Sequence, residues 1–309
     1  MMNNLYYRAQ LDAHDQAIYD QLLKGFLNYD EEIHVMHPHQ KIMVLMNAIH
    51  DDYPLLFYVE FHHFTYRSSL FSCSVIITYL FSKDETKRLI EDCKKWGTYI
   101  YQHCPSNMTN LDKYVWIHDT LVANTTYDIS NSESAFSMLG VVREKRAVCE
   151  GISLAFKYLC DVFQLPAIVV DGTLHGIPHA WNLIWLHQHA SFVDVTNDIQ
   201  NSKQIDRSSF LRNSKQMSDY TWNQELIPEC RISNKSDDYV VAYSKQDYLK
   251  YIKSLKRNQN MKIKFEIKPA LSEFELKDYI HQGILRNPLL LTSGCFYSVD
   301  GQYISIKNK

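Results

Sequence analysis

Residues 143–198 read REKRAVCEGISLAFKYLCDVFQLPAIVVDGTLHGIPHAWNLIWLHQHASFVDVTND, and this stretch decides the fold of the chain. It contains Cys149, then His179 30 residues later, and then Asp194 a further 15 residues along. A cysteine attacks a carbonyl group as the thiolate, and a nearby imidazole can take its proton and later return it. A carboxylate that accepts a hydrogen bond from the imidazole orients the ring. These three residue types, in this order, predict a thiol active site.

The residues after Cys149 show the pattern of a helix that begins at the cysteine. Apolar side chains recur at helical spacing as far as Phe163, and Pro166 then ends the pattern. The start of a helix presents free backbone N–H groups and a favourable dipole, and both stabilise a thiolate. Three apolar segments follow and are expected to form strands: Ala167–Asp171, Ala180–Leu186 and Ser191–Val195. Antiparallel pairing of the last two can bring His179 and Asp194 side by side.

Three motifs in this order resemble the transglutaminase-like superfamily: Val148-Cys149-Glu150-Gly151, His179-Ala180-Trp181-Asn182 and Val193-Asp194-Val195-Thr196. Upstream, three further segments resemble those that lead to the nucleophile in bacterial members: Lys113–Asp119, Thr126–Asp128 and Ser134–Gly140. The resemblance covers roughly residues 109–200, about a third of the chain. It implies an α+β fold with a papain-like or transglutaminase-like core, in which helices pack on an antiparallel sheet. It also implies that Cys149, His179 and Asp194 form a catalytic triad.

The sequence departs from the pattern of this superfamily at two places. Members often have a Gly-Lys-Trp type of turn before the strand that leads to the aspartate, whereas this chain has Gln188–Phe192. Members often have a tryptophan after the threonine, whereas this chain has Asn197. Both departures concern the hairpin turn and the rim of the expected site, so they bear on the substrate more than on the triad.

The rest of the sequence indicates two smaller α+β units around this core. We expect an N-terminal domain over residues 1–108, a catalytic domain over 109–235 and a C-terminal domain over 236–309. Expected elements of the first are helices at Asp15–Leu27 and Lys41–Ile49, strands at Leu56–Tyr66 and Leu70–Leu80, and a long helix opened by a capping box at Ser82–Glu85. The last is expected to end in a hairpin around Asp300-Gly301.

Composition and charge exclude several classes of protein. The 309 residues are 46% hydrophobic, which is ample for packed cores, and they carry a net charge of −3 with no dense basic run, so we expect no nucleic-acid partner. The longest apolar run is too short and too interrupted to span a bilayer, so we expect no membrane partner. The seven cysteines are scattered without paired spacing, and no apolar signal segment opens the chain, so a cytoplasmic location is expected.

Four further residues are candidates for binding the substrate or its oxyanion. Gly151 would leave room for a substrate backbone over the first turn of the helix, and Trp181 is expected to pack beneath the site. The oxyanion would be held by the backbone N–H of Cys149 and by a second donor, for which Trp116 and Tyr127 are the candidates. Histidine pairs such as His62-His63 have no third ligand at a suitable spacing, so we predict no metal site and no cofactor.

Two classes of function are compatible with these residues. The first is an enzyme that acts through a Cys149 thioester on peptide or side-chain amide bonds of a protein or peptide substrate. Water as the acceptor makes it a cysteine protease, amidase or deamidase, and an amine as the acceptor makes it a transglutaminase. The second is a non-catalytic protein-binding module built on the same fold. Three ordered and independent motifs favour the enzyme.

Overall fold

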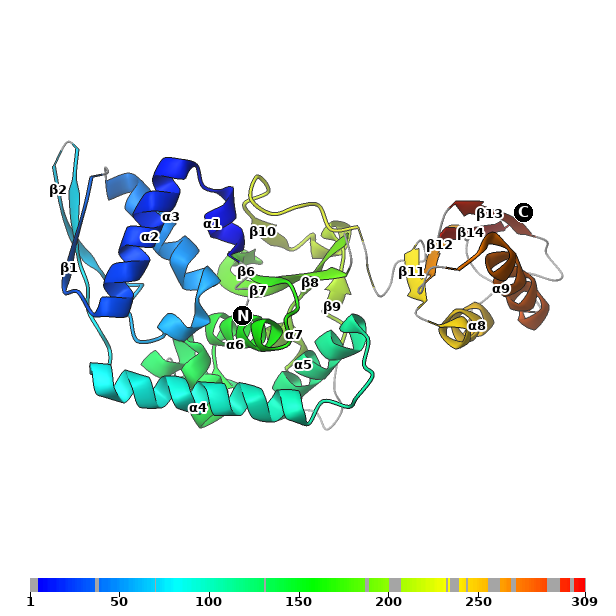
Figure 1. Ribbon diagram of the computed structural model, residues 1–309, viewed down its shortest axis with the longest axis horizontal. Coiled ribbons are helices and arrows are strands. Elements are labelled where there is room, and N and C mark those ends of the chain that lie inside the picture. Colours follow the sequence, from blue (N-terminus) through cyan, green and yellow to red (C-terminus); the bar gives the residue numbers. More distant parts are fainter. Residues whose placement is uncertain are drawn as a thin grey trace. The chain divides into compact units, whose positions relative to one another are not determined.

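The computed structural model describes residues 5–36, 39–69, 71–130, 132–186, 189–199, 207–231, 233, 239–242, 244–254, 262–267, 271–287, 295–300 and 303–308. The chain divides into two compact units, Met1–Arg231 and Ile232–Lys309. Both units combine helices with mainly antiparallel sheets, which confirms the predicted α+β class (Figure 1). Within the described residues, no helix combines the length and apolar character needed to cross a membrane.

The first unit contains most of the helices. Its α-helices are α1 (Tyr6–Gln10), α2 (Ala13–Asn28), α3 (His39–Asp52), α4 (Lys83–Gln102), α5 (Asn110–Asn124), α6 (Cys149–Val162) and α7 (Val195–Asp198). Its short helical turns are η1 (Pro54–Leu56), η2 (Glu133–Phe136), η3 (Gly140–Glu144) and η4 (Ser214–Met217). Of the capping box predicted for α4, the structure shows the N-cap half, in which the Ser82 side chain accepts from the backbone N–H of Glu85.

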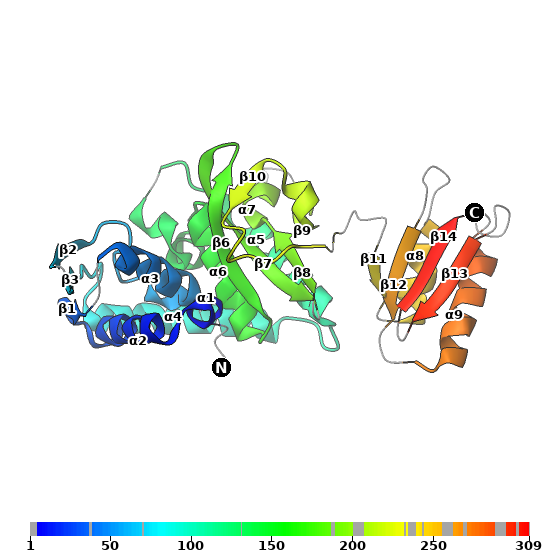
Figure 2. The same cartoon turned by 90° about the horizontal axis from the view of Figure 1, so that it is seen from above.

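The central sheet of the first unit has five strands in the order β10-β6-β7-β8-β9. Its members are β6 (Ala167–Leu174), β7 (Ile177–Leu186), β8 (His189–Val193), β9 (Phe210–Arg212) and β10 (Tyr220–Trp222). All of its neighbouring strands are antiparallel. Figure 2 shows α6 lying along β6 and β7, which it contacts. The helix and three strands predicted for residues 143–198 are therefore present, and β6 and β7 extend a few residues beyond the predicted ends. The third strand, predicted over Ser191–Val195, starts and ends two residues earlier, because Val195 begins α7.

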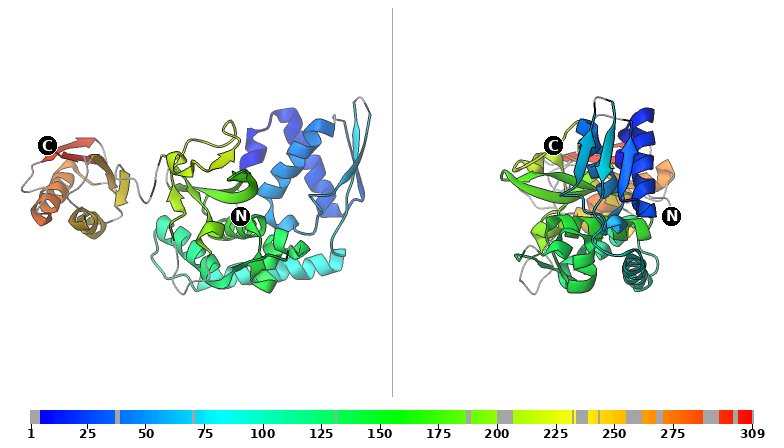
Figure 3. Two further views of the ribbon diagram at one scale, coloured as in Figure 1. Left: turned by 180° about the vertical axis from the view of Figure 1, so that it is seen from behind. Right: turned by 90° about the vertical axis from the view of Figure 1, so that its left-hand side faces the viewer.

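Two smaller sheets complete the first unit. A three-stranded antiparallel sheet has the order β1-β3-β2, with β1 (Glu32–Val35), β2 (Thr65–Ser68) and β3 (Cys73–Ile76), and its blue and cyan strands are visible in Figure 3. A short parallel pair joins β4 (Thr126–Tyr127) to β5 (Arg146–Ala147), immediately before α6. This pair holds the segment that contains Tyr127 against the segment that leads to Cys149.

The N-terminal segment corrects one expectation about secondary structure. The strand predicted over residues 56–66 is wrong for most of its length, because Leu56 ends a 3₁₀ turn and only Thr65–Ser68 pair as a strand. The aromatic residues Phe57, Tyr58 and Phe61 produced the strand-like pattern, and in the structure they are buried in the core from a loop. Aromatic side chains can therefore be buried in the core from a loop, without belonging to a strand of a sheet.

One hydrophobic core crosses the domain boundary that was expected between residues 108 and 109. It joins side chains of α2 and α3, such as Leu22 and Met46, to side chains of α6, such as Phe156 and Leu159. The residues before the expected boundary thus belong to the same compact unit as α6 and the central sheet.

The second unit is a small α+β module. Its elements are β11 (Tyr239–Ala242), α8 (Lys245–Ser254), β12 (Lys262–Ile267), α9 (Glu273–Arg286), β13 (Cys295–Asp300) and β14 (Tyr303–Asn308). The sheet order is β11-β12-β14-β13, with β11 and β12 parallel and the other pairs antiparallel. The hairpin of β13 and β14 is confirmed, while Gly301 in its predicted turn lies outside the described residues.

Gly151 has a different role from the one that the sequence suggested. A Cβ atom on Gly151 would lie 2.4 Å from the carbonyl oxygen of Ala135 and 2.6 Å from that of Ser137. Both atoms belong to the backbone at η2, so they cannot move aside as a flexible side chain could. The glycine therefore makes room for the chain's own η2 segment, and the expectation that it makes room for a substrate is wrong.

This contact leads to a prediction about stability. Gly151→Ala is expected to lower the free energy of unfolding by about 1–3 kcal/mol, since overpacking at a rigid site forces backbone shifts. Urea denaturation of the variant and the wild type measures the difference. Glu91→Ala on the exposed face of α4 serves as the control, and should change stability by less than about 0.5 kcal/mol. Equal stability of Gly151→Ala and the wild type would contradict the close packing at η2.

Candidate active site

Cys149 is the first residue of α6. Val148 occupies the N-cap position in an extended conformation, with φ −82° and ψ 176°. No side chain accepts a hydrogen bond from the first N–H groups of the helix at this position. The first N–H groups of a helix have no partner within it, so the backbone around Cys149 can donate to a bound anion. The Cys149 side chain is partly exposed, whereas Cys160, about three turns further along α6, is buried. Position and exposure distinguish Cys149 from a cysteine of the core.

His179 and Asp194 are brought together by the hairpin of β7 and β8. His179 lies near the start of β7, opposite Gly172 of β6, and Asp194 directly follows the end of β8. The Nε2 atom of His179 lies 2.8 Å from Oδ2 of Asp194. The side chain of His179 is 10% exposed and that of Asp194 is 1% exposed. The sequence-based expectation that antiparallel pairing places these two residues side by side matches this geometry.

The carboxylate of Asp194 is held by three groups. Besides His179, the hydroxyl of Tyr220 donates to Oδ2 at 2.7 Å, and the backbone N–H of Asn197 donates to Oδ1 at 3.0 Å. The side-chain amide of Asn197 also donates to the hydroxyl of Tyr220 at 2.8 Å. Asp194 thereby caps α7 while it orients the imidazole. A buried carboxylate requires such partners, because an unpaired charge away from water is costly.

The pKa of His179 reflects its two neighbours. Burial alone would lower this pKa, but hydrogen bonding to Asp194 and to the Cys149 thiol outweighs burial and raises the pKa to about 9. Because Nε2 of His179 faces Asp194, the Nδ1 atom is the one available to the thiol. His179 is therefore an imidazole that interacts with a carboxylate on one side and a thiol on the other.

Tyr127 is the candidate oxyanion donor that lies next to Cys149. Its hydroxyl interacts with Cys149, and burial and the charge of Cys149 raise the pKa of Tyr127. The pairing of β4 with β5 explains this position, since Tyr127 lies opposite Ala147, two residues before the cysteine. The side chain is 46% exposed, so a substrate can reach the same point.

Two of the other candidates lie in supporting positions. The indole N–H of Trp116 donates to the backbone carbonyl of Ile100 at 3.3 Å, so Trp116 joins α5 to α4 and is not an oxyanion donor. Trp181 is fully buried, and its ring stacks on His179 with 5.8 Å between centroids. It packs beneath the imidazole, as expected from the sequence.

Sequence reasoning missed the roles of Tyr220 and Asn197. Tyr220 comes from β10, 26 residues after Asp194, and no local pattern marks it. Asn197 was noticed only as a departure from the tryptophan of the transglutaminase-like superfamily. In this chain the side chain of Asn197 donates to the hydroxyl of Tyr220, which in turn donates to Asp194, so Asn197 helps to position the aspartate.

A buried imidazole supports the helix that Asp194 caps. Nε2 of His118 on α5 lies 3.0 Å from Oδ2 of Asp198 at the end of α7, and Nδ1 lies 3.0 Å from Oδ1 of Asp119. Arg207 pairs with the same Asp119. His118 is fully buried, and its neighbouring carboxylates raise its pKa in spite of burial. This chain of contacts fixes α7 on α5.

Glu150, the residue after Cys149, forms ion pairs with two histidines from the N-terminal segment. Its Oε1 atom lies 3.2 Å from Nε2 of His50 and 3.1 Å from Nε2 of His62. Nδ1 of His50 in turn lies 3.1 Å from Oδ1 of Asp51. Burial opposes both charged forms, but the pairing raises the pKa of His50 to about 10 and lowers that of Glu150 to about 2. Across the described part of the chain, no group of three or more ligand-type side chains is arranged to hold a metal.

Comparisons with known proteins give matches only among solved structures. No protein-family model matches the chain, and no curated protein does. A transglutaminase (TGase) structure is 16% identical with a TM-score of 0.34, covering 69% of this chain and 59% of its own. A candidate cysteine protease from Cytophaga hutchinsonii is 12% identical with a TM-score of 0.31, covering 56% and 73%. A candidate protease from Parabacteroides distasonis is 7% identical with a TM-score of 0.26, covering 81% and 61%.

The chain thus spans 59% of the length of the TGase. At these identities and TM-scores, we base the function of this chain on its own residues.

The contacts of Glu150 lead to a prediction about stability and pH. Glu150→Gln is expected to lower the free energy of unfolding by about 1–3 kcal/mol near pH 6, because the buried imidazole of His50 loses the carboxylate that pairs with its charge. Most of this loss belongs to His50, since the His62 side chain is 48% exposed and solvent screens its share. Chemical denaturation at several pH values measures the difference. Glu85→Gln in the first turn of α4 is the matched control.

The sign of the pH dependence follows from the two shifts. The pKa of Glu150 is lowered, so its contribution is present above its ordinary value near 4.5 and is lost as pH falls towards 2. The pKa of His50 is raised, so its contribution is present below its ordinary value near 6.5 and is lost as pH rises towards 10. The difference between wild type and Glu150→Gln should therefore be largest between about pH 4.5 and 6.5. A difference that is the same at every pH would contradict this ion pairing.

Proposed function

We propose that this protein is a thiol-dependent enzyme that acts on peptide or side-chain amide bonds of proteins through a thioester on Cys149. The observation that carries the proposal is the position of His179, which bonds to Asp194 at 2.8 Å and interacts with the Cys149 thiol. The start of α6 adds backbone N–H groups at the same point. A buried carboxylate, an imidazole of raised pKa and a partly exposed thiol at a helix N-terminus together support nucleophilic catalysis.

The first half of the reaction uses all of these groups. His179 takes the thiol proton of Cys149, and the sulfur attacks the carbonyl carbon of the amide. The carbonyl oxygen becomes an oxyanion, which accepts from the backbone N–H of Cys149 and from the hydroxyl of Tyr127. His179 then gives its proton to the departing nitrogen, the C–N bond breaks, and the acyl group stays on sulfur as a thioester. Asp194 keeps the imidazole oriented and stabilises its charge throughout.

The second half depends on the acceptor. Water that loses a proton to His179 attacks the thioester carbon, releases a carboxylic acid and restores the thiol, which is hydrolysis or deamidation. A primary amine that loses a proton to His179 and attacks the thioester carbon instead forms a new amide and restores the thiol, which is transglutaminase chemistry. The same three residues serve both outcomes, so the proposal covers both. The substrate is a protein or a peptide in either case.

One experiment separates the outcomes and tests the enzyme against the non-catalytic binding module. The protein is incubated with a protein mixture and a labelled primary amine, and mass spectrometry records new termini, deamidated glutamines and amine adducts. New termini indicate a protease, deamidation indicates a deamidase, and adducts indicate a transglutaminase. The Cys149→Ala protein is the control. If wild-type and Cys149→Ala samples give the same products, the enzyme is excluded and the binding module takes its place.

Substitutions in the three residues should reduce turnover to different degrees. Cys149→Ala abolishes it, because no other group can form the thioester, and His179→Ala costs nearly as much. Asp194→Asn should cost about 10²–10³ in kcat, less than the roughly 10⁴ of the equivalent change in serine triads, since a thiol is more acidic than a hydroxyl. Steady-state kinetics and thermal melting are compared for the three variants. Equal losses in all three would show that Asp194 contributes more than orientation.

The raised pKa of His179 sets the alkaline limit of activity. Below about pH 9 the imidazole keeps the proton that the leaving nitrogen needs, so kcat/KM should fall as pH rises through about 9. Asp194→Asn removes the charge that raises this pKa, so the alkaline limb should move to lower pH. A pH profile of both proteins measures the shift. An alkaline limb at the same pH in both would argue against control by the His179–Asp194 pair.

A further inference from the structure

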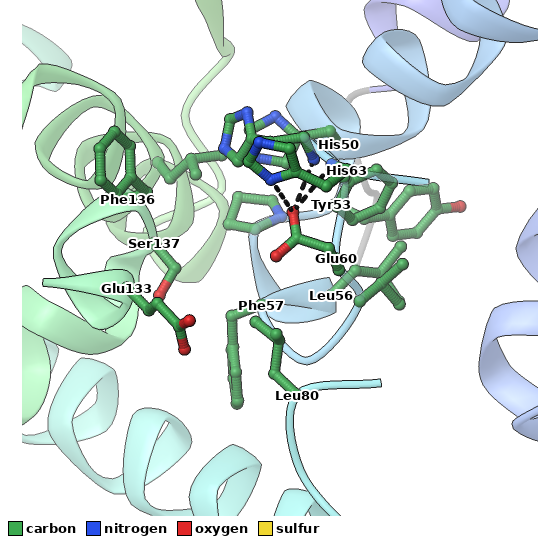
Figure 4. A pocket seen from close by; sticks show the side chains of 15 residues that line it. His50, Tyr53, Leu56, Phe57, Glu60, His63, Leu80, Glu133, Phe136 and Ser137 are labelled. Carbon is green, nitrogen blue, oxygen red and sulfur yellow. Dashed lines mark hydrogen bonds and ion pairs between the residues drawn. The ribbon is translucent and has the colours of Figure 1, made fainter. Parts of the chain in front are cut away.

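A cavity of about 460 Å³ lies beside α6, outside the group of Cys149, His179 and Asp194. Its walls come from α3 and η1, from the loop that follows η1, from η2 and from Leu154 on α6. Most of the lining is apolar or aromatic, with Leu56, Phe57, Leu80, Phe136 and Leu154 among its members. Cavities of about 300–1,000 Å³ with apolar walls and a few polar groups are the usual form of small-molecule sites. Figure 4 shows Leu56, Phe57, Leu80 and Phe136 around the open space.

Two carboxylates face this space from different segments. Glu60 comes from the loop after η1, and its Oε1 atom accepts from the backbone N–H groups of His62 at 2.8 Å and His63 at 3.2 Å. Its second oxygen has no hydrogen-bond partner among the described residues. Glu133 begins η2 on the other side of the cavity, and its exposed carboxylate likewise has no ion-pair partner in the described chain. Figure 4 shows Glu60 and Glu133 on different sides, with Phe57 and Leu80 nearby.

The imidazoles of the cavity do not neutralise these two carboxylates. His50 pairs with Asp51 and with Glu150, and His62 pairs with Glu150, so these two imidazoles are already matched by two other carboxylates. His63 is 89% exposed and its Nδ1 atom lies 3.8 Å from Glu60, a contact that solvent screens. The cavity therefore retains unbalanced negative charge next to aromatic rings. Carboxylates and aromatic faces attract the same kind of group, an organic cation.

We propose that this cavity binds a primary ammonium compound with an aliphatic or aromatic stem. The ammonium group lies between Glu60 and Glu133, to which it donates hydrogen bonds. The stem packs on Phe57, Leu80 and Phe136, where removal of its apolar surface from water favours binding. Neither part needs the thiol of Cys149, so the site stands independently of the proposed catalysis.

The test is calorimetric titration of the full-length protein with three compounds of similar shape. These are 2-phenylethylamine, which is cationic, 2-phenylethanol, which is neutral, and 3-phenylpropionate, which is anionic. The amine should bind up to about 25-fold more tightly than the alcohol, since each of the two partly exposed charge pairs contributes up to about five-fold. The acid should bind most weakly. Equal binding of the amine and the alcohol would overturn the proposal.

A fourth compound separates two sources of the same chemistry. Nα-acetyl-lysine amide carries the ammonium on the side chain of an amino acid. Binding of both 2-phenylethylamine and this compound assigns the cavity to lysine side chains of proteins as well as to free amines. Binding of 2-phenylethylamine alone assigns it to free aromatic amines, and binding of neither overturns the proposal.

Variants locate the binding in this cavity. Glu133→Gln should weaken binding of the amine about five-fold and leave binding of the alcohol unchanged, and the double variant with Glu60→Gln about 25-fold if the two effects add. Among the residues that the structure describes, Glu133 has no partner whose loss would unfold the protein, so this variant stays informative if Glu60→Gln is unstable. Glu225→Gln, an exposed change outside the cavity, is the matched control. Cys149→Ala should bind as the wild type does. Unchanged amine binding in Glu133→Gln would overturn the proposal.

Discussion

The buried carboxylate of Asp194 is the interaction on which the candidate site depends. It is 1% exposed and accepts hydrogen bonds from His179, Tyr220 and the backbone of Asn197. A carboxylate buried in this way is stable only when its oxygens accept hydrogen bonds. The positions of the three donors are therefore fixed by the position of the carboxylate. The donors come from β7, β10 and α7, which fixes the edge of the central sheet, the first turn of a helix and the imidazole together.

The start of α6 adds a second constraint of a different kind. No side chain caps the helix at Val148, so the first N–H groups keep their capacity for an anion. The backbone of η2 approaches so closely at Gly151 that no side chain fits there. Helix α6, whose first residue bears the Cys149 thiol, packs against η2 and also against β6 and β7. Regular secondary structure therefore aligns the thiol with His179. Rigid support of this sort is what a reacting group needs.

Local patterns in the sequence account for part of this arrangement. The apolar spacing after Cys149 predicted α6, and the order of the motifs predicted that a hairpin unites His179 with Asp194, because both signals lie within a few residues of what they determine. Tyr220 and the partners of Glu150 could not be found in this way. They come from 26 residues after Asp194 and from about 90–100 residues before Glu150, where only the folded chain brings them close. The strand predicted near Phe57 was wrong for a different reason. The aromatic residues there produce the local pattern of a buried strand, but they are buried from a loop.

Cys149 and Glu150 show how one helix can serve two sites. Consecutive residues of a helix point about 100° apart, so neighbouring side chains leave the same turn in different directions. Cys149 turns towards His179 on the central sheet, whereas Glu150 turns towards His50 and His62 beside the cavity. Leu154, one turn after Glu150 on the same face, lines that cavity. A displacement of α6 would therefore change the thiol's contact with His179 and the cavity wall together, so the ion pairs of Glu150 stabilise the position of the nucleophile as well as the cavity.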